Sequence, residues 1–155
     1  RALAHPLAFN VFARIDAFLA DGYTGEEDKL QRETRKILGD ATLRVEATCV
    51  RVPVERCHAE SVSVEFERAL SPERARALLS AAAGIAVEDE PARDLHPQPL
   101  QCSGRDPVVV GRIRASRAFE HGLAFWLVGD QLRKGAALNA VQIVERLAGA
   151  GAPSG

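Results

Sequence analysis

Two short runs of alternating residues, separated by a short irregular segment, constrain the fold of this chain most. The first run is L-R-V-E-A-T-C-V, from Leu43 to Val50, and the second is S-V-S-V-E-F, from Ser61 to Phe66. Apolar and polar side chains alternate in both runs, which is typical of strands with one buried face. The sequence therefore predicts a connected pair of strands around which the rest of the chain is organised.

The segment between these runs carries two residues that suit acid–base chemistry on an anionic substrate. Arg51 and His58 lie seven residues apart, and Pro53 prevents a continuous strand ladder between them. Arginine presents a planar fork that matches a carboxylate, and histidine can move a proton near neutral pH. The alternative, in which Arg51 forms a salt bridge in the sheet and His58 caps a turn, stays open.

The bulk properties exclude several classes of protein. The chain has 155 residues, enough for one domain or for half of a two-domain enzyme, and a net charge of -1. That charge gives no electrostatic reason to expect nucleic acid or a membrane as a partner, and no apolar run approaches the roughly 20 residues that span a bilayer. The odd number of cysteines predicts reduced thiols in a cytoplasmic protein, and no spacing indicates a metal site.

The first residue is Arg1, and the chain contains no methionine. A translated product starts with methionine, and trimming that residue rarely leaves arginine first. We therefore expect this chain to be a piece of a longer protein.

The remaining periodic segments predict a fold with both helices and strands. A buried extended run is expected around Phe9 and Val11, and a loop from Glu88 to Asp106. Capping signals at Thr24 and Ser71 begin two of the predicted helices. The helices are expected at about 26–38, 71–82 and 134–148, and the further strands at 85–87, 108–114 and 123–128.

The predicted class is α+β (α/β), with a mixed, mostly antiparallel sheet of five or six strands and helices packed on one face. The predicted domain spans residues 1–148, followed by a flexible tail at 149–155.

Five motifs, in order, resemble one known family. They are N-V-F-A-R-I-D-A-F, G-Y-T-G-E-E-D-K-L-Q-R-E-T-R-K-I-L, C-V-R-V-P-V-E-R-C-H-A, V-V-V-G-R-I-R and V-G-D-Q-L-R-K-G-A-A-L-N-A-V-Q-I-V-E. Together they are similar to the C-terminal domain of bacterial aspartate-β-semialdehyde dehydrogenases, from about Leu7 to Leu147. That domain carries substrate binding and dimerisation, so the resemblance implies a homodimer and a dehydrogenase C-terminal-domain-like fold.

The resemblance also implies a reaction. β-Aspartyl phosphate is reduced with NADPH to aspartate β-semialdehyde and phosphate, a step toward lysine, methionine and threonine. In the family a cysteine thiolate forms the covalent intermediate. The cofactor, NADP, would be bound mainly by an N-terminal domain.

Site residues follow from the resemblance position by position. Arg51 would hold the substrate α-carboxylate, and His58 would be the general acid/base. Glu26 would contact the substrate ammonium and Lys29 the phosphate, although their spacing alone favours an intrahelical ion pair. Gln131 would contact the nicotinamide end of the cofactor.

Other residues have simpler explanations. Arg112 and Arg114 share a strand face and could bind phosphate, but salt bridges with Asp or Glu are favoured. Cys57 precedes His58, yet adjacent residues on an extended segment point to opposite sides, which argues against a Cys–His dyad. Cys49 is expected to be a small core residue.

Two features of the family are missing from these 155 residues. Neither the Asn-Cys-Thr type motif of the nucleophile nor the glycine-rich turn for the cofactor pyrophosphate occurs. We therefore expect the chain alone to be inactive. The alternatives are a non-catalytic dimerisation protein, an N-acetyl-γ-glutamyl-phosphate reductase relative, and an α+β domain with chance matches.

Overall fold

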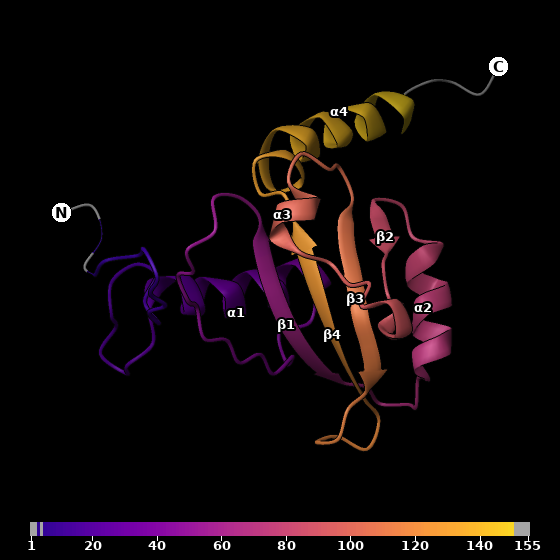
Figure 1. The fold of residues 1–155 in the computed structure, drawn as a ribbon, viewed down its shortest axis with the longest axis horizontal. Helices are drawn as coiled ribbons and strands as arrows, with labels where there is room; N and C mark the ends of the chain where they lie inside the picture. Colours follow the sequence, from indigo (N-terminus) through magenta and orange to yellow (C-terminus); the bar gives the residue numbers. More distant parts are fainter. Residues whose placement is uncertain (1–2, 4, 151–155) are drawn as a thin grey trace. The chain divides into compact units, whose positions relative to one another are not determined.

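The computed structural model describes residue 3 and residues 5–150 (Figure 1). The chain forms two compact units, residues 1–54 and 55–155, and each is described by itself. Helices and a mixed sheet are both present, which confirms the α+β class.

The first unit is built on helix α1, Gly25–Leu38. Thr24 caps it through the predicted capping box, in which the Glu27 carboxylate accepts from the Thr24 amide at 2.7 Å. Gly39 ends the helix in the left-handed conformation, with φ of 68°. The other Glu27 oxygen accepts from the amide of Cys49 at 2.8 Å, so this buried carboxylate also fixes the chain that follows α1.

The predicted strand from Leu43 to Cys49 does not form within the described residues. Side-chain burial still alternates along it, as the pattern predicted, but no neighbouring strand supplies a ladder. Instead, a single bridge joins Arg51 to Phe12. The prediction of a buried run near Phe9 and Val11 is wrong, because both side chains are exposed.

The second unit contains a four-stranded sheet in the order β1-β4-β3-β2, rather than the five or six strands expected. The strands are β1 His58–Glu65, β2 Ile85–Val87, β3 Val108–Ala115 and β4 Gly122–Gly129. β4 pairs antiparallel with β1 and β3, and β2 pairs parallel with β3 (Figure 1). The sheet is thus mixed and mostly antiparallel, as predicted.

Both faces of the central strands are covered, which explains their nearly continuous apolar sequence. Helix α2, Pro72–Ser80, packs through Ala75 on one face, against Val110, Ile113 and Leu123. Val109 and Val128 point the other way, toward Cys57 and Cys102. The short helices on the loop before β3 are η1 Pro91–Arg93 and α3 Pro99–Cys102.

A β-bulge interrupts β3 where the loop passes close to it. A Cβ at Gly111 would overlap the carbonyl oxygen of Glu88 and the ring of Pro97, so only glycine fits there. The register shifts between Gly111 and Arg114, and Arg112 has a φ of 56°.

The C-terminal segment follows β4. It begins as a π-helix, η2 Arg133–Ala137, and continues as α4 Leu138–Ala150 beyond the end of β4 (Figure 1). Its apolar side chains Val141, Val144 and Leu147 are exposed. The helix extends two residues into the predicted tail, whose remainder lies outside the described residues.

We predict that Glu27→Gln lowers the melting temperature by a few degrees at neutral pH. The amides of Cys49 and Thr24 lower the pKa of Glu27, so its stabilisation is present above the unfolded pKa and is lost as pH falls. The difference in melting temperature between Glu27→Gln and the unchanged chain should therefore shrink below about pH 4.3, the ordinary pKa of glutamate. Thermal unfolding at several pH values tests this, with Glu33→Gln, exposed on the same helix, as control. A gap independent of pH contradicts it.

Candidate functional site

Arg51, near the end of the first unit, forms an antiparallel backbone bridge with Phe12, near its start. Its amide donates to the Phe12 carbonyl at 2.9 Å, and its carbonyl accepts from the Phe12 amide at 3.3 Å. The side chain is half-buried. The backbone is therefore fixed where the guanidinium group leaves it.

Glu26 and Lys29 lie on the first turn of α1. Their side chains form the predicted intrahelical ion pair, with Lys29 Nζ 3.3 Å from Glu26 Oε1. The hydrogen bond to Glu26, with the charge of that carboxylate, raises the pKa of Lys29. Because both groups are partly exposed, the pair contributes little to stability and can exchange partners. The ion-pair interpretation is confirmed, and a substrate role stays a prediction.

His58 is the first residue of β1 and pairs with Gly129 of β4. Its side chain is exposed, whereas that of Cys57 is only 4% exposed. Burial raises the pKa of the Cys57 thiol, and the nearby carboxylate of Asp130 adds to the effect. A buried, protonated thiol is a poor nucleophile. The two neighbours therefore differ in environment, although Cys57, with a φ of 80°, does not adopt the extended conformation that the argument against a dyad assumed.

Gln131 lies next to the residue that precedes His58. Its side-chain Oε1 accepts from the Cys57 amide at 2.8 Å. Because Oε1 is used as the acceptor, the amide NH₂ of Gln131 is left as a donor, and no partner for it is found in the described part of the chain. The structure thus brings together two predicted site residues, His58 and Gln131, that are distant in sequence.

Asp130 is a residue that sequence reasoning missed. Its side chain is fully buried and accepts from Arg56 Nη2 at 2.7 Å, from the Gly104 amide at 2.7 Å and from the Leu132 amide at 3.0 Å. Burial opposes its ionisation, but the hydrogen bonds from Arg56, Gly104 and Leu132 outweigh burial and lower the pKa of Asp130. No local sequence pattern marks Asp130, because its donors Arg56 and Gly104 come from distant segments.

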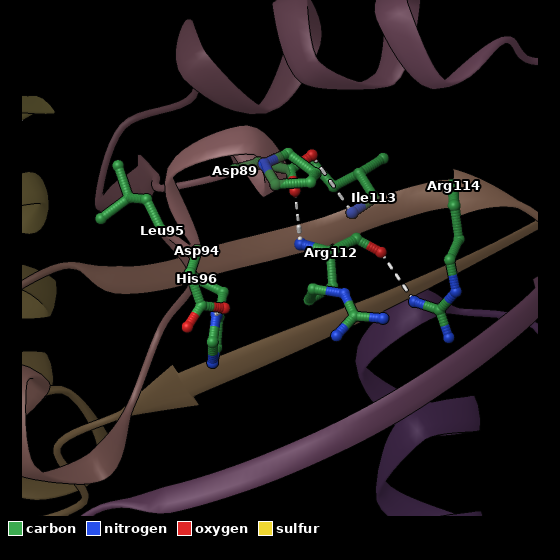
Figure 2. Close-up of a pocket in the computed structure, with 8 residues that line it drawn as sticks. Asp89, Asp94, Leu95, His96, Arg112, Ile113 and Arg114 are labelled. Atoms are coloured by element: carbon green, nitrogen blue, oxygen red, sulfur yellow. Dashed lines mark hydrogen bonds and ion pairs between the residues drawn. The ribbon is translucent and has the colours of Figure 1, made fainter.

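A pocket of about 300 Å³ lies on β3 (Figure 2). Arg112, Arg114 and His96 line it, and both guanidinium groups lie on the same side of the strand. Within the described residues neither arginine forms the salt bridge with Asp or Glu that the sequence favoured. Arg114 Nη1 instead donates to the Arg112 carbonyl at 2.7 Å. Asp89, whose side chain is 1% exposed, holds the bulge instead and accepts from the Arg112 amide at 2.7 Å.

The predicted site residues fall into two sets. Glu26, Lys29 and Arg51 belong to the first unit, and His58 and Gln131 belong to the second. Each set is described within its own unit.

The described residues contain no cluster of three His, Cys, Asp or Glu side chains that could hold a metal ion. None of the helices described combines the length and the apolar character that crossing a membrane requires.

A family model described as "Semialdehyde dehydrogenase, dimerisation domain" matches residues 1–134. The aspartate-semialdehyde dehydrogenase of Aquifex aeolicus is 53% identical over 143 residues, which are 92% of this chain and 42% of that protein. The Synechocystis enzyme is 46% identical over 94% of the chain and 43% of its own length. The chain therefore spans less than half the length of these relatives.

Solved structures show the same likeness. Aspartate semialdehyde dehydrogenase II from Vibrio cholerae, solved also in complex with ASA, superposes with a TM-score of 0.91 at 40% identity. The match covers 96% of this chain and 44% of that one. The Candida albicans enzyme, solved with NADP, has a TM-score of 0.67 at 28% identity and covers 81% of this chain and 40% of its own.

We predict that a thiol reagent modifies Cys49 before Cys57 and Cys102. Cys49 is partly exposed, whereas the other two are buried and burial raises the pKa of each. Alkylation at pH 8 followed by peptide mass mapping measures the order. In urea the three should react at similar rates. Preferential reaction of Cys57 in the folded chain would show an activated thiol and contradict our description.

Proposed function

Because the chain belongs to the semialdehyde dehydrogenase family, whose dimerisation-domain model it matches, we propose that it supplies the substrate-binding and dimerisation half of an NADP-dependent aspartate-semialdehyde dehydrogenase. That enzyme reductively dephosphorylates L-aspartyl-4-phosphate to L-aspartate 4-semialdehyde, on the way to lysine, methionine and threonine. The observation that carries the proposal is the 53% identity to the Aquifex aeolicus enzyme over 92% of the chain.

In the first unit, we assign the charged ends of the substrate to three side chains. Arg51 would bind the α-carboxylate through a bidentate, charge-assisted contact, for which its planar fork is suited. Glu26 would take the ammonium group and Lys29 the phosphate. The exposed ion pair between Glu26 and Lys29 supports this assignment, because each partner can turn to a ligand group of opposite charge at little cost.

In the second unit, His58 would be the general acid/base. Its imidazole is exposed, and a histidine side chain suits proton transfer during the formation and collapse of a tetrahedral oxyanion. The buried Cys57 would not serve as the nucleophile. In the proposed enzyme the nucleophilic cysteine lies outside these 155 residues, because no Asn-Cys-Thr motif occurs in them.

The free amide NH₂ of Gln131 fits the cofactor proposed for this site. With Oε1 engaged by the Cys57 amide, that group can only donate, and the carboxamide oxygen of a nicotinamide is a matching acceptor. NADPH would supply the hydride, bound mainly by a domain outside this chain. Gln131 would then fix the nicotinamide ring beside the turn that carries His58.

Two further properties belong to the proposal. The name of the matching domain supports a homodimer, with small-molecule substrate and phosphate as the other partners. The three cysteines form no disulfide in the described part of the chain, which supports a reducing compartment such as the cytoplasm.

An assembled protein tests the activity. The chain replaces the homologous part of the Aquifex aeolicus relative, and NADPH formation from aspartate semialdehyde, NADP and phosphate is measured. We expect activity from the assembly and none from the chain alone. His58→Asn should lower kcat about 100- to 10,000-fold, because general acid–base catalysis is lost.

The same assembly separates substrate binding from chemistry and from the related reductase activity. Arg51→Leu should raise KM for the semialdehyde about 10- to 100-fold, since a charge-assisted contact is removed. Exposed Arg93→Leu is the matched control. Turnover of N-acetylglutamate semialdehyde in preference to aspartate semialdehyde, or dependence of activity on neither His58 nor Arg51, would contradict the proposal.

We also expect the isolated chain to dimerise. Light scattering should give twice the 16.7 kDa of the chain at micromolar concentration. A mass of one chain at all concentrations would contradict the proposed dimer.

A further inference from the structure

The turn that leads into β1, residues 55–57, is held in a conformation that its own backbone disfavours. Cys57 has a φ of 80°, in the left-handed region where residues other than glycine are strained. Its side chain is also buried. A conformation of this kind persists only where the surroundings impose it, and such positions cluster at functional sites. His58 is the next residue.

Two contacts from the end of β4 impose the conformation of this turn. Arg56 Nη2 lies 2.7 Å from Asp130 Oδ2, and the amide of Cys57 donates to Gln131 Oε1 at 2.8 Å. Both acceptors follow β4 directly. Since His58 pairs with Gly129, the contacts lie on the two residues before His58 and on the two residues after its partner.

Asp130 is fixed independently of Arg56. Its carboxylate also accepts from the amides of Gly104 and Leu132, and its carbonyl oxygen accepts from the amides of Arg133 at 3.1 Å and Lys134 at 3.0 Å. The Asp130 carboxylate is therefore a rigid acceptor that holds Arg56 and fixes the position of the turn. A mobile side chain at this position could not do so.

The ion pair is a poor device for stability alone. Taking the Asp130 carboxylate fully, and the Arg56 side chain partly, out of water is costly, and apolar residues of similar size would often be at least as stable. Moreover, Arg56 Nε is buried without a hydrogen-bond partner among the described residues. A pair that leaves a polar atom unsatisfied calls for another explanation, and fixing the direction of the neighbouring residue supplies one.

We propose that Arg56 and Asp130 are positioning residues for His58: their ion pair, with the Cys57–Gln131 hydrogen bond, sets the backbone from which the imidazole projects. This inference rests on the proposed function, in which His58 handles the proton. Neither residue contacts substrate, and both act through the turn.

The first test uses the chain itself. Arg56→Gln removes the charge and Arg56→Lys keeps it, while Arg93→Gln removes an exposed arginine that also pairs with a carboxylate, Glu90. Hydrogen exchange of the Cys57 amide and the NMR signals of the His58 ring are measured. We expect at least 10-fold faster exchange and shifted ring signals in Arg56→Gln, near-normal values in Arg56→Lys and no change in Arg93→Gln. Unchanged exchange and signals in Arg56→Gln overturn the inference.

The second test uses the assembled dehydrogenase with the same variants and Asp130→Asn. Displacing a catalytic group by about 1 Å can cost 100-fold, so we expect kcat to fall about 10- to 100-fold in Arg56→Gln and Asp130→Asn. KM for the semialdehyde should change less than about threefold, and Arg56→Lys should restore most of kcat. Rates are corrected for the folded fraction, measured by circular dichroism.

The outcomes separate the two proposals. If His58→Asn abolishes activity but the corrected kcat of Arg56→Gln and Asp130→Asn stays normal, the positioning role is wrong and the proposed function stands. If His58→Asn leaves activity intact, the proposed function is wrong, and the positioning role toward catalysis is wrong with it.

Discussion

The pairing of β4 with strands on both of its sides is the interaction on which the second unit depends. Its register against β1 places His58 opposite Gly129, and its register against β3 closes the core at Val109 and Val128. A shift of one residue would move every side chain of β4 to the other face. It would also remove Asp130 and Gln131 from the turn before His58. The register that builds the core therefore builds the candidate site as well.

Much of this fold was predictable because the signals are local. The capping box at Thr24, the serine cap at Ser71 and the alternation of β1 each depend on residues a few positions apart, and the structure confirms them. The run from Leu43 to Cys49 has an equally good pattern, and its burial alternates, yet it forms no strand in the described structure. Alternation selects a buried face, whereas a strand also requires a neighbour, and sequence pattern does not supply one.

The site was less predictable, because its contacts join distant residues. Gln131 and Cys57 are 74 positions apart, and Asp130 bonds to Arg56 and Gly104 from two other segments. Arg51 and His58 were singled out from the sequence itself, whereas the roles of Glu26, Lys29 and Gln131 came from resemblance to a family. Such a resemblance transfers residue identities but not their hydrogen bonds. No local pattern marks Asp130. Its role follows only from burial and from the donors that surround it.

Asp130 and Asp89 solve the same physical problem in two places. Each aspartate has a buried side chain that accepts from backbone amides of irregular segments and from one arginine. Asp130 accepts from the amides of Gly104 and Leu132 and from Arg56. Asp89 accepts from the Arg112 amide at the bulge of β3 and from Arg76 at 2.6 Å. Irregular backbone inside a protein leaves amides that no ladder satisfies, and an ionised carboxylate is a strong acceptor for them. The arginine offsets the buried charge. Irregular turns beside the sheet can thus be as rigid as the strands. A site that positions a histidine for proton transfer requires such rigidity.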